Sequence, residues 1–346
     1  MQDIDLQSTL ERSLARFEEI LDPAHPAHAR QVCQKTFAFE PVDELPFVYR
    51  NGAEGIDTEW PSFPYNDTFA DRTKMLLDQL RAPFFHHQMG DYHPLNIRTN
   101  YGTVILPSIF GVDYQLTETS LPWANHLGSR DEVRELIDRG VPDLRSGLGG
   151  RCFETAQYYQ EVLSNYPKLD ETIVIYHPDL QGPFDVAHLI WGPDILMGVY
   201  DCPEMVHELL SLVVETYIQW VKAWKALVGE GNEFTTHWNF YMQGGVMIRD
   251  DTPVMLRTEH YEEFVKPYDQ MLLDEFGGCI HFCGRGDAFI ASMCESHNLY
   301  GINSSQPDWN DMDLFLRSTL GNRIPVLGLP EEYLPDDVTT GVIVLR

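Results

Sequence analysis

The sequence is organised around one segment, Phe276-Gly277-Gly278-Cys279-Ile280-His281-Phe282-Cys283-Gly284-Arg285-Gly286-Asp287. It combines a short apolar core with two metal-capable side chains and a glycine-rich exit into an expected helix. If residues 279–283 form a strand, side chains alternate between its two faces, so Cys279, His281 and Cys283 share one face. An imidazole and a thiolate two residues apart can then bind one ion, and zinc favours both ligand types. The spacing therefore indicates a candidate metal site at His281 and Cys283.

The same pattern also fits an ordinary buried strand. Free Cys is among the most buried residue types, and a strand that contains one His is commonly part of a core. Two ligands do not complete a catalytic zinc site, which usually has three protein ligands and one open position. The spacing alone therefore leaves both interpretations open and does not identify a third ligand.

The composition is that of a folded globular protein. The chain has 346 residues, of which 43% are hydrophobic and 12% aromatic, and a formal net charge of −29. This charge argues against nucleic acid and against anionic membrane surfaces, because both need a basic protein surface. The first twenty residues lack the basic and apolar regions of a signal peptide, and the six cysteines are too sparse for a disulfide scaffold. We therefore expect a cytoplasmic protein with reduced thiols and no membrane span.

Beyond residue 82, apolar strands alternate with helices. We expect strands at residues 104–107, 173–177, 237–242, 246–249, 279–283, 299–304 and 324–329. We expect helices at residues 130–139, 154–165, 203–228, 259–276, 287–297 and 312–320. Repeated strand and helix units imply a parallel sheet, and their number fits a TIM (β/α)8 barrel. In that fold the chemistry lies at the C-terminal ends of the strands, where His281 and Cys283 fall.

The first 81 residues are expected to form an N-terminal helical and loop-rich extension packed on a barrel of residues 82–346. A stripe of apolar residues at spacings of three and four predicts a helix over residues 6–21. Prolines without a clear period predict a loop-rich segment over residues 22–64, and a further helix is expected at residues 69–80. Residues 341–346 look like a further strand.

Three segments resemble the uroporphyrinogen decarboxylase superfamily. They are Gln181-Gly182-Pro183-Phe184-Asp185-Val186-Ala187, Glu262-Glu263-Phe264-Val265-Lys266-Pro267-Tyr268 and His281-Phe282-Cys283-Gly284. The first is similar to the G-x-P-[WF]-T-L segment of the superfamily. The other two are similar to the E-x-F-x-x-P-Y helix and the H-x-C-G strand end of its methyltransferase branch. The resemblance spans residues 82–328 and implies a TIM barrel, zinc at His281 and Cys283, and a corrinoid (cobalamin) as methyl carrier.

The decarboxylase itself fits less well. Gly102 stands where that family has its essential Asp, Leu189 stands where it has a Tyr, and its Arg-rich N-terminal loop has no counterpart. The resemblance therefore implies a zinc-assisted methyltransferase that moves a methyl group between a corrinoid, or another methyl carrier, and a thiol. One alternative is a metal-free lyase of the decarboxylase type that acts on a carboxylated substrate. Another is a non-catalytic protein that binds a corrinoid or tetrapyrrole.

The third metal ligand is an open question within the resemblance. Relatives in the methyltransferase branch typically use a Cys near the last strand, but this chain has no Cys after Cys294. Glu331 or Glu332, just beyond the expected strand at 324–329, is a candidate oxygen ligand, because zinc accepts carboxylate. Both glutamates also fit as solvated loop acids.

Further site residues follow from positions at strand ends. Asp250 and Asp251 follow the strand at 246–249, so we expect them at the barrel mouth as catalytic groups or as acceptors for His281, with helix capping as the alternative. His177 is a further catalytic candidate. Expected substrate contacts are Asn100, Tyr101, Asp179, Gln181 and Arg285. Arg98, Arg151, Arg249 and Arg285 stand out in an acidic chain as groups for a substrate carboxylate or phosphate, although surface salt bridges also explain them.

Expected partners follow from the same interpretation. They are a small-molecule thiol or a tetrapyrrole-type substrate, a corrinoid protein and, as an assembly, a homodimer.

Overall fold

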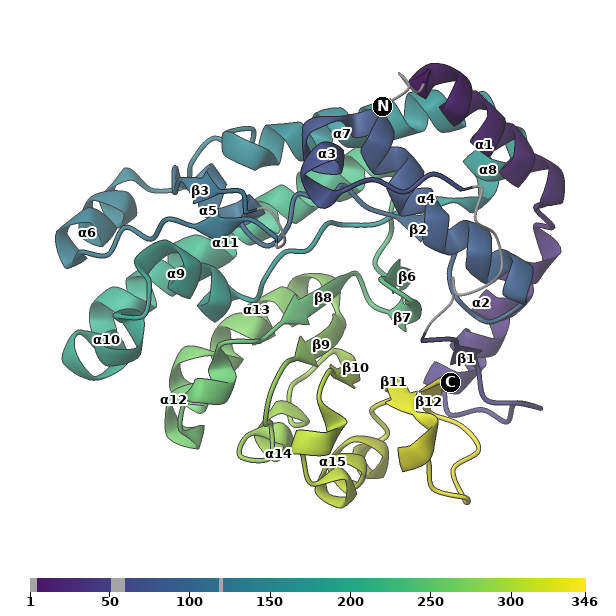
Figure 1. Ribbon diagram of the computed structural model, residues 1–346. Helices are drawn as coiled ribbons and strands as arrows, with labels where there is room; N and C mark the ends of the chain where they lie inside the picture. Colours follow the sequence, from purple (N-terminus) through teal and green to yellow (C-terminus); the bar gives the residue numbers. More distant parts are fainter. Residues whose placement is uncertain (1–4, 51–59, 118–120) are drawn as a thin grey trace.

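A computed structural model of the chain describes residues 5–50, 60–117 and 121–346 (Figure 1). Its centre is a six-stranded sheet in the order β1-β12-β11-β10-β9-β8. The strands are β1 (Phe47–Val48), β8 (Val246–Arg249), β9 (Gly278–Phe282), β10 (Leu299–Ser304), β11 (Val326–Pro330) and β12 (Val342–Leu345). All five neighbouring pairs are parallel. The expected α/β class with a parallel, TIM-like sheet is therefore confirmed.

Three shorter strand pairs accompany this sheet. β2 (Asn96–Ile97) and β5 (Val174–Ile175) are parallel, whereas β3 (Tyr114–Gln115) with β4 (Trp123–Ala124) and β6 (Phe234–His237) with β7 (Phe240–Gln243) are antiparallel. Single backbone hydrogen bonds extend from segments near β2 and β5 toward the two edge strands of the main sheet. The Tyr92 amide donates to the Phe47 carbonyl at 2.9 Å, and the Gly182 amide donates to the Arg249 carbonyl at 2.8 Å.

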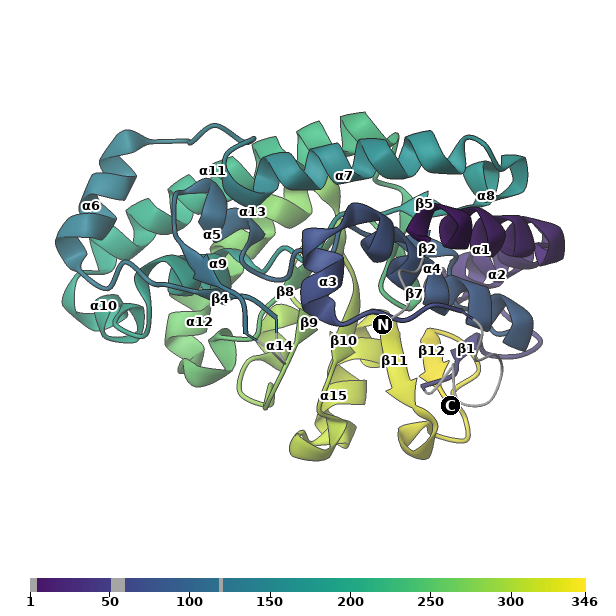
Figure 2. The ribbon, with the colours of Figure 1, turned by 45° about the horizontal axis from the view of Figure 1, so that its top comes forward.

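Helices surround these strands. They are α1 (Leu6–Ile20), α2 (Ala24–Phe37), α3 (Tyr65–Ala70), α4 (Arg72–Met89), α5 (Ile105–Ile109), α6 (Arg130–Arg139), α7 (Gly147–Leu163), α8 (Pro167–Thr172), α9 (Pro183–Trp191), α10 (Ile195–Asp201), α11 (Pro203–Val228), α12 (Thr258–Phe264), α13 (Lys266–Phe276), α14 (Ile290–Met293) and α15 (Met312–Thr319). Figure 2 shows α7 and α11 running along one side of the molecule. Along the described residues, no helix is both long and apolar enough to cross a membrane.

The longest helix, α11, has the bounds predicted from its sequence. It begins at Pro203, which lacks the amide hydrogen that a first helical position leaves unused. It ends at Val228 and is followed by Gly229, whose left-handed backbone (φ 76°) few other residues adopt easily. Its apolar face is buried and includes Trp220 and Trp224, whose rings stack 5.4 Å apart. Clear periodicity and clear end signals made this helix predictable.

Several predicted elements were wrong. Residues 104–107 were expected as a strand but lie at the start of the buried helix α5, because a short apolar run does not distinguish a strand from a buried helix. The segment 22–64, expected as loop, contains α2 and β1, while residues 51–59 of it lie outside the described residues. Pro23 and Pro26 fall before and in the first turn of α2, where proline is tolerated.

Other elements exist but are divided or shorter. The expected strand at 237–242 instead spans the turn of the β6–β7 hairpin and most of β7, and the chain turns at Trp238 with a positive φ of 47°. The expected helix at 259–276 is split into α12 and α13 next to Pro267, whose nitrogen cannot donate a hydrogen bond. Of the helix expected at 287–297, only the short α14 forms.

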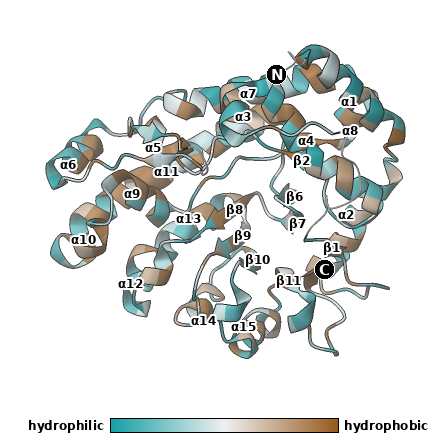
Figure 3. Cartoon of the chain, viewed as in Figure 1, coloured by the Kyte–Doolittle hydropathy of each residue, from teal (hydrophilic) through white to brown (hydrophobic). Residues whose placement is uncertain are grey.

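The β6–β7 hairpin packs into a second buried cluster below the functional end of the sheet. In this cluster Phe240 and Met242 of β7 join Met247 of β8, Cys279 of β9 and Leu327 of β11. Helix α2 adds buried residues to the same cluster. Figure 3 shows β8 and β9 as largely hydrophobic strands. Cys279 is therefore a core residue, one layer deeper than His281.

The hairpin approaches β9 closely at Gly244, and a substitution there tests this approach. Its φ is 92°, and a Cβ there would overlap the backbone of Gly277 and Gly278. Because backbone cannot move aside, we expect Gly244→Ala to lower the free energy of unfolding by about 3 kcal/mol or more. Gly229→Ala is the matched control, since Gly229 has a similar φ but open space around it, and it should cost only about 1 kcal/mol. If urea denaturation showed the same loss of unfolding free energy for Gly244→Ala and Gly229→Ala, the close approach of Gly244 to β9 would be contradicted.

Candidate metal centre

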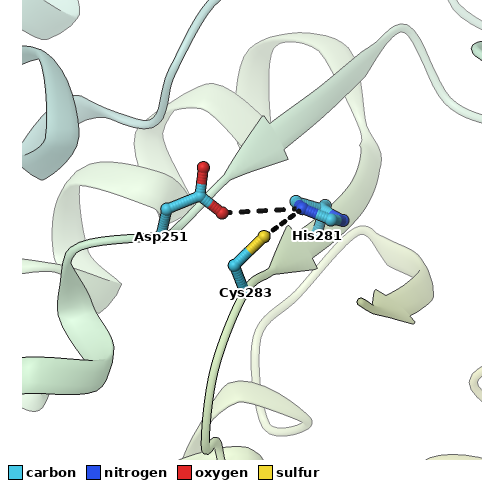
Figure 4. Close-up of side chains that lie close together, drawn as sticks. All are labelled: Asp251, His281 and Cys283. Atoms are coloured by element: carbon cyan, nitrogen blue, oxygen red, sulfur yellow. Dashed lines mark hydrogen bonds and ion pairs between the residues drawn. The ribbon is translucent and has the colours of Figure 1, made fainter. Parts of the chain in front are cut away.

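Three potential ligands gather at the C-terminal ends of β8 and β9 (Figure 4). His281 lies in β9, Cys283 directly follows it, and Asp251 follows β8. Their ligand atoms all lie within 4.8 Å of one another. The His281 Nε2 atom is 3.3 Å from Cys283 Sγ and 3.5 Å from Asp251 Oδ1. The predicted pair is thus joined by a carboxylate from the neighbouring strand.

The donor set suits a borderline metal ion such as zinc. It offers one imidazole nitrogen, one sulfur and one carboxylate oxygen, which are the three ligand types that zinc binds in proteins. His281 is 3% exposed, whereas Asp251 and Cys283 are half-buried. Both His281 and Cys283 line a cavity of about 550 Å³. Three potential ligands, two of which line a cavity, match the arrangement of catalytic zinc sites, which keep one position for substrate.

The side chains of the cluster shift one another's pKa values so that His281 is favoured as a cation and Asp251 as an anion. Burial by itself lowers the pKa of His281, but hydrogen bonds to Asp251 and Cys283 outweigh burial and raise this pKa to about 9. Burial raises the pKa of Asp251, yet the hydrogen bond to His281 and the charges of His281 and Arg249 hold it well below its usual range. Without a metal ion, the site therefore holds a proton. Metal binding would release that proton, as expected for a site of ionisable ligands.

Neighbouring side chains orient two of the three ligands. The His281 Nδ1 atom is 2.6 Å from Asn303 Oδ1. The Gln181 side-chain amide donates to Asp251 Oδ2 at 3.2 Å, and Arg249 Nη2 lies 4.0 Å from the same oxygen. Such contacts fix the direction in which a ligand presents its lone pair. Gln181, expected as a substrate contact, thus touches a ligand of the cluster.

Asp179, also expected to contact substrate, lies behind the cluster and contacts Arg98, Arg249 and Trp238. It is 5% exposed and lies between two arginines, 2.6 Å from Arg98 Nη1 and 3.1 Å from Arg249 Nη1. It also accepts a hydrogen bond from Trp238 Nε1 at 2.9 Å. The Trp238 ring lies 4.7 Å from the Arg249 guanidinium and 4.8 Å from the His281 ring. Asp179 therefore holds Arg249 and Trp238 in place beside the metal cluster.

Other predicted site residues lie away from the cluster. His177 is fully buried, with Nδ1 bonded to the Pro178 carbonyl at 2.9 Å and Nε2 accepting from the Met247 amide at 3.2 Å, so it links β8 to the segment after β5. The Tyr101 hydroxyl bonds Thr155 at 2.8 Å, and the backbone amide of Asn100 donates to the Met75 sulfur. The Arg285 side chain is 74% exposed and pairs with Asp287.

Neither glutamate that was expected as a third ligand reaches the cluster. Glu332 forms a two-oxygen contact with Arg50 at 3.0 Å, and Glu331 pairs with Arg346 at 3.1 Å. The carboxylate that lies within reach of His281 and Cys283 is that of Asp251, which the sequence indicated only as a catalytic or supporting group. The available signal was its place two residues beyond the strand that precedes β9.

Asp250 points into a different environment from that of Asp251. Its side chain is fully buried and hydrogen-bonds with Asp269 of α13, with Asp185 close by. Burial raises the pKa of Asp250 well above its ordinary value, and the charge of Asp269 raises it further. Burial also raises the pKa of Asp269, to about 8, although the hydrogen bond to Asp250 opposes this shift. Burial therefore disfavours the ionised form of both carboxyl groups, which lie outside the metal cluster.

Taken together, the fold and site define a TIM-like α/β protein with a candidate metal cluster at the C-terminal ends of its strands. No protein-family model matches the sequence, and no curated protein matches it either. Among solved structures, a methyltransferase from Methanosarcina mazei has a similar fold, with a TM-score of 0.64 and 16% sequence identity. The alignment covers 88% of this chain and 84% of that chain. At this identity the similarity concerns the fold.

The buried acid pair predicts a pH-dependent stability. Because the pKa of Asp269 is about 8 in the folded protein, against an ordinary aspartate value of 3.8, the folded state binds more protons between these values. The stabilisation that comes from the proton on Asp269 is complete below about pH 4 and is lost as pH rises through about 8. We expect the unfolding free energy to fall with pH in this window, by up to about 1.4 kcal/mol per pH unit for one group.

Urea denaturation at several pH values checks this expectation. Asp269→Asn should flatten the dependence, because it removes the group that takes up the proton. Asp274→Asn, on the exposed side of the same helix, is the control and should keep the wild-type slope. Identical slopes for all three proteins would show that Asp269 does not retain a proton in the folded state.

Proposed function

We propose that this protein is a zinc-assisted methyltransferase that moves a methyl group between a corrinoid, or another methyl carrier, and a small-molecule thiol. The observation that carries the proposal is the meeting of Asp251, His281 and Cys283 within 4.8 Å beside a cavity. The similarity in fold to a methyltransferase supports it. Zinc held by these three side chains would leave one coordination position for the substrate sulfur.

The residues of the chain would divide the work. A bound zinc ion supplies the charge that keeps a substrate thiol ionised at neutral pH, which is the nucleophilic form. In the transfer, a bond forms between the thiolate sulfur and the methyl carbon. The bond between that carbon and its carrier breaks, and its electron pair stays with the carrier. The thiol proton leaves to solvent before the transfer.

Arg249 is the group that we propose for substrate orientation. It lines the cavity next to His281 and Cys283, and Asp179 and Trp238 hold it there. A guanidinium group binds carboxylate or phosphate through two parallel hydrogen bonds. The cavity volume of about 550 Å³ suits a small molecule, so a larger methyl carrier or a corrinoid protein would dock at the mouth.

We also infer that the strands close into a (β/α)8 barrel. Eight strands are available when β2 and β5 join the six of the main sheet. The hydrogen bonds from Tyr92 to Phe47 and from Gly182 to Arg249 support placing this pair between β1 and β8. Residues 82–346 would then supply seven strands, and the N-terminal extension would supply the eighth, β1.

Elemental analysis of the purified protein tests the metal. We expect about one zinc ion per chain in the wild type. Cys283→Ser and His281→Ala should each abolish stoichiometric zinc and methyl transfer from methylcobalamin to a thiol, and Asp251→Asn should weaken both. Cys294→Ser is the matched control, because Cys294 lies in the segment after α14, outside the cluster, and should retain zinc.

Contrary outcomes separate the alternatives. A correctly folded, metal-free wild type that still transfers methyl groups would sink the proposal. Activity on a carboxylated substrate that is indifferent to Cys283→Ser would favour the lyase. A tight coloured complex with cobalamin, without turnover, would favour the carrier.

A further inference from the structure

The orientation of one amide side chain decides how His281 faces the cluster. Asn303 of β10 lies opposite His281 in the parallel register of β9 and β10. Its Nδ2 atom lies 2.6 Å from the Leu327 carbonyl oxygen of β11. A carbonyl oxygen only accepts hydrogen bonds, so the atom of Asn303 that faces it must be the NH2 group. The amide oxygen of Asn303 therefore points at His281.

That amide oxygen in turn selects the nitrogen that carries the proton. Asn303 Oδ1 lies 2.6 Å from His281 Nδ1, and an amide oxygen only accepts. The Nδ1 atom must therefore be the protonated donor. The Nε2 atom is left facing Cys283 and Asp251. If the ring were flipped, the buried amide oxygen would lose its donor, which is costly in a dry environment.

The Leu327 carbonyl lies where β11 is irregular. The register between β11 and β12 shifts between Leu327 and Leu329, so Gly328 forms a bulge. The φ of Gly328 is 71°, and a Cβ there would lie 2.6 Å from the Phe240 ring and 3.1 Å from Asn303 Nδ2. Bulges next to functional sites often redirect neighbouring groups. A side chain at this position would overlap the Phe240 ring and crowd the Asn303 amide.

We propose that Asn303 is a positioning residue that fixes His281 as the Nδ1-protonated tautomer, with Nε2 directed at the metal, and that the Gly328 bulge keeps Asn303 in place. The proposal rests on the metal site of the proposed function. Asn303 does not touch the metal position itself. It acts through His281, and the Leu327 carbonyl acts through Asn303.

Zinc titration of variants tests the energetic side. Asn303→Leu removes both hydrogen bonds at similar volume, and we expect zinc affinity to fall about 10-fold to 100-fold. Asn303→Asp keeps an acceptor for His281 Nδ1 but loses the donor to Leu327, so its loss should be smaller. Asn66→Leu is the matched control, because Asn66 lies on α3, outside the cluster, and the change removes a hydrogen bond from its side-chain amide to the Thr117 carbonyl. It should leave the affinity unchanged.

NMR of protein labelled with ¹⁵N-histidine tests the tautomer, which a merely structural role would not change. In the zinc-loaded wild type we expect a protonated Nδ1 and a metal-bound Nε2 for His281, whose signals are identified by their loss in His281→Ala. In Asn303→Leu the protected Nδ1 proton should disappear. Zinc bound through Nδ1 in the wild type, or unchanged affinity and tautomer in Asn303→Leu, would overturn the proposal.

Two further outcomes are decisive. If Asn303→Leu does not fold, Asn303→Asp and the wild-type spectrum decide the question alone. If the wild type binds no zinc, the proposed function fails, and the Nδ1 proton in the metal-free protein decides the role of Asn303. A protected Nδ1 proton there supports the contact, and a freely exchanging one refutes it.

Discussion

The parallel pairing of β8 with β9 is the constraint on which the site depends. Its register sets Arg249 opposite His281, so the residues just beyond both strands emerge side by side. Close packing at the start of this pair requires glycine, because a Cβ at Gly278 would overlap the Val246 carbonyl. A shift of one residue would turn His281 away from Asp251 and toward the opposite face. The chemistry of the cluster is therefore a consequence of one strand register.

Local patterns in the sequence were sufficient for part of this structure. Alternation along a strand placed His281 and Cys283 on one face, with Cys279 deeper, and helical spacing with clear end signals defined α11. These predictions depend only on residues close together in the chain. The third ligand could not be obtained in this way, since Asp251 meets His281 through strand pairing, which local sequence does not encode. Asp251 was predicted at the barrel mouth as a catalytic group or as an acceptor for His281, and not as a metal ligand.

The misassigned elements failed for related reasons. Residues 237–242 are mostly aromatic or apolar, and the single turn-favouring residue among them, Asn239, was not enough to indicate a reversal at Trp238. The hairpin is held by tertiary contacts instead, including the hydrogen bond from Trp238 to Asp179 and that from the Asn96 amide to the Trp238 carbonyl. Such contacts offset the cost of a bulky residue with positive φ. A turn stabilised by distant residues leaves little trace in its own sequence.

The contrast between Asp250 and Asp251 shows how sharply the environment changes across β8. The two residues are adjacent, yet Asp251 faces His281 and Arg249 while Asp250 lies among buried carboxyl groups. A buried carboxyl group is stable only if it is protonated or paired with a positive group. The neighbour of Asp250 is another acid, Asp269, so Asp250 has no positive partner there. Asp251 can stay ionised because His281, Arg249 and the Gln181 amide compensate its charge. Arg249 is in turn balanced by Asp179, which also pairs with Arg98. Acidic and basic side chains thus alternate from Arg98 through Asp179 and Arg249 to Asp251. At the end of this series, Asp251 is the carboxylate available to a cation.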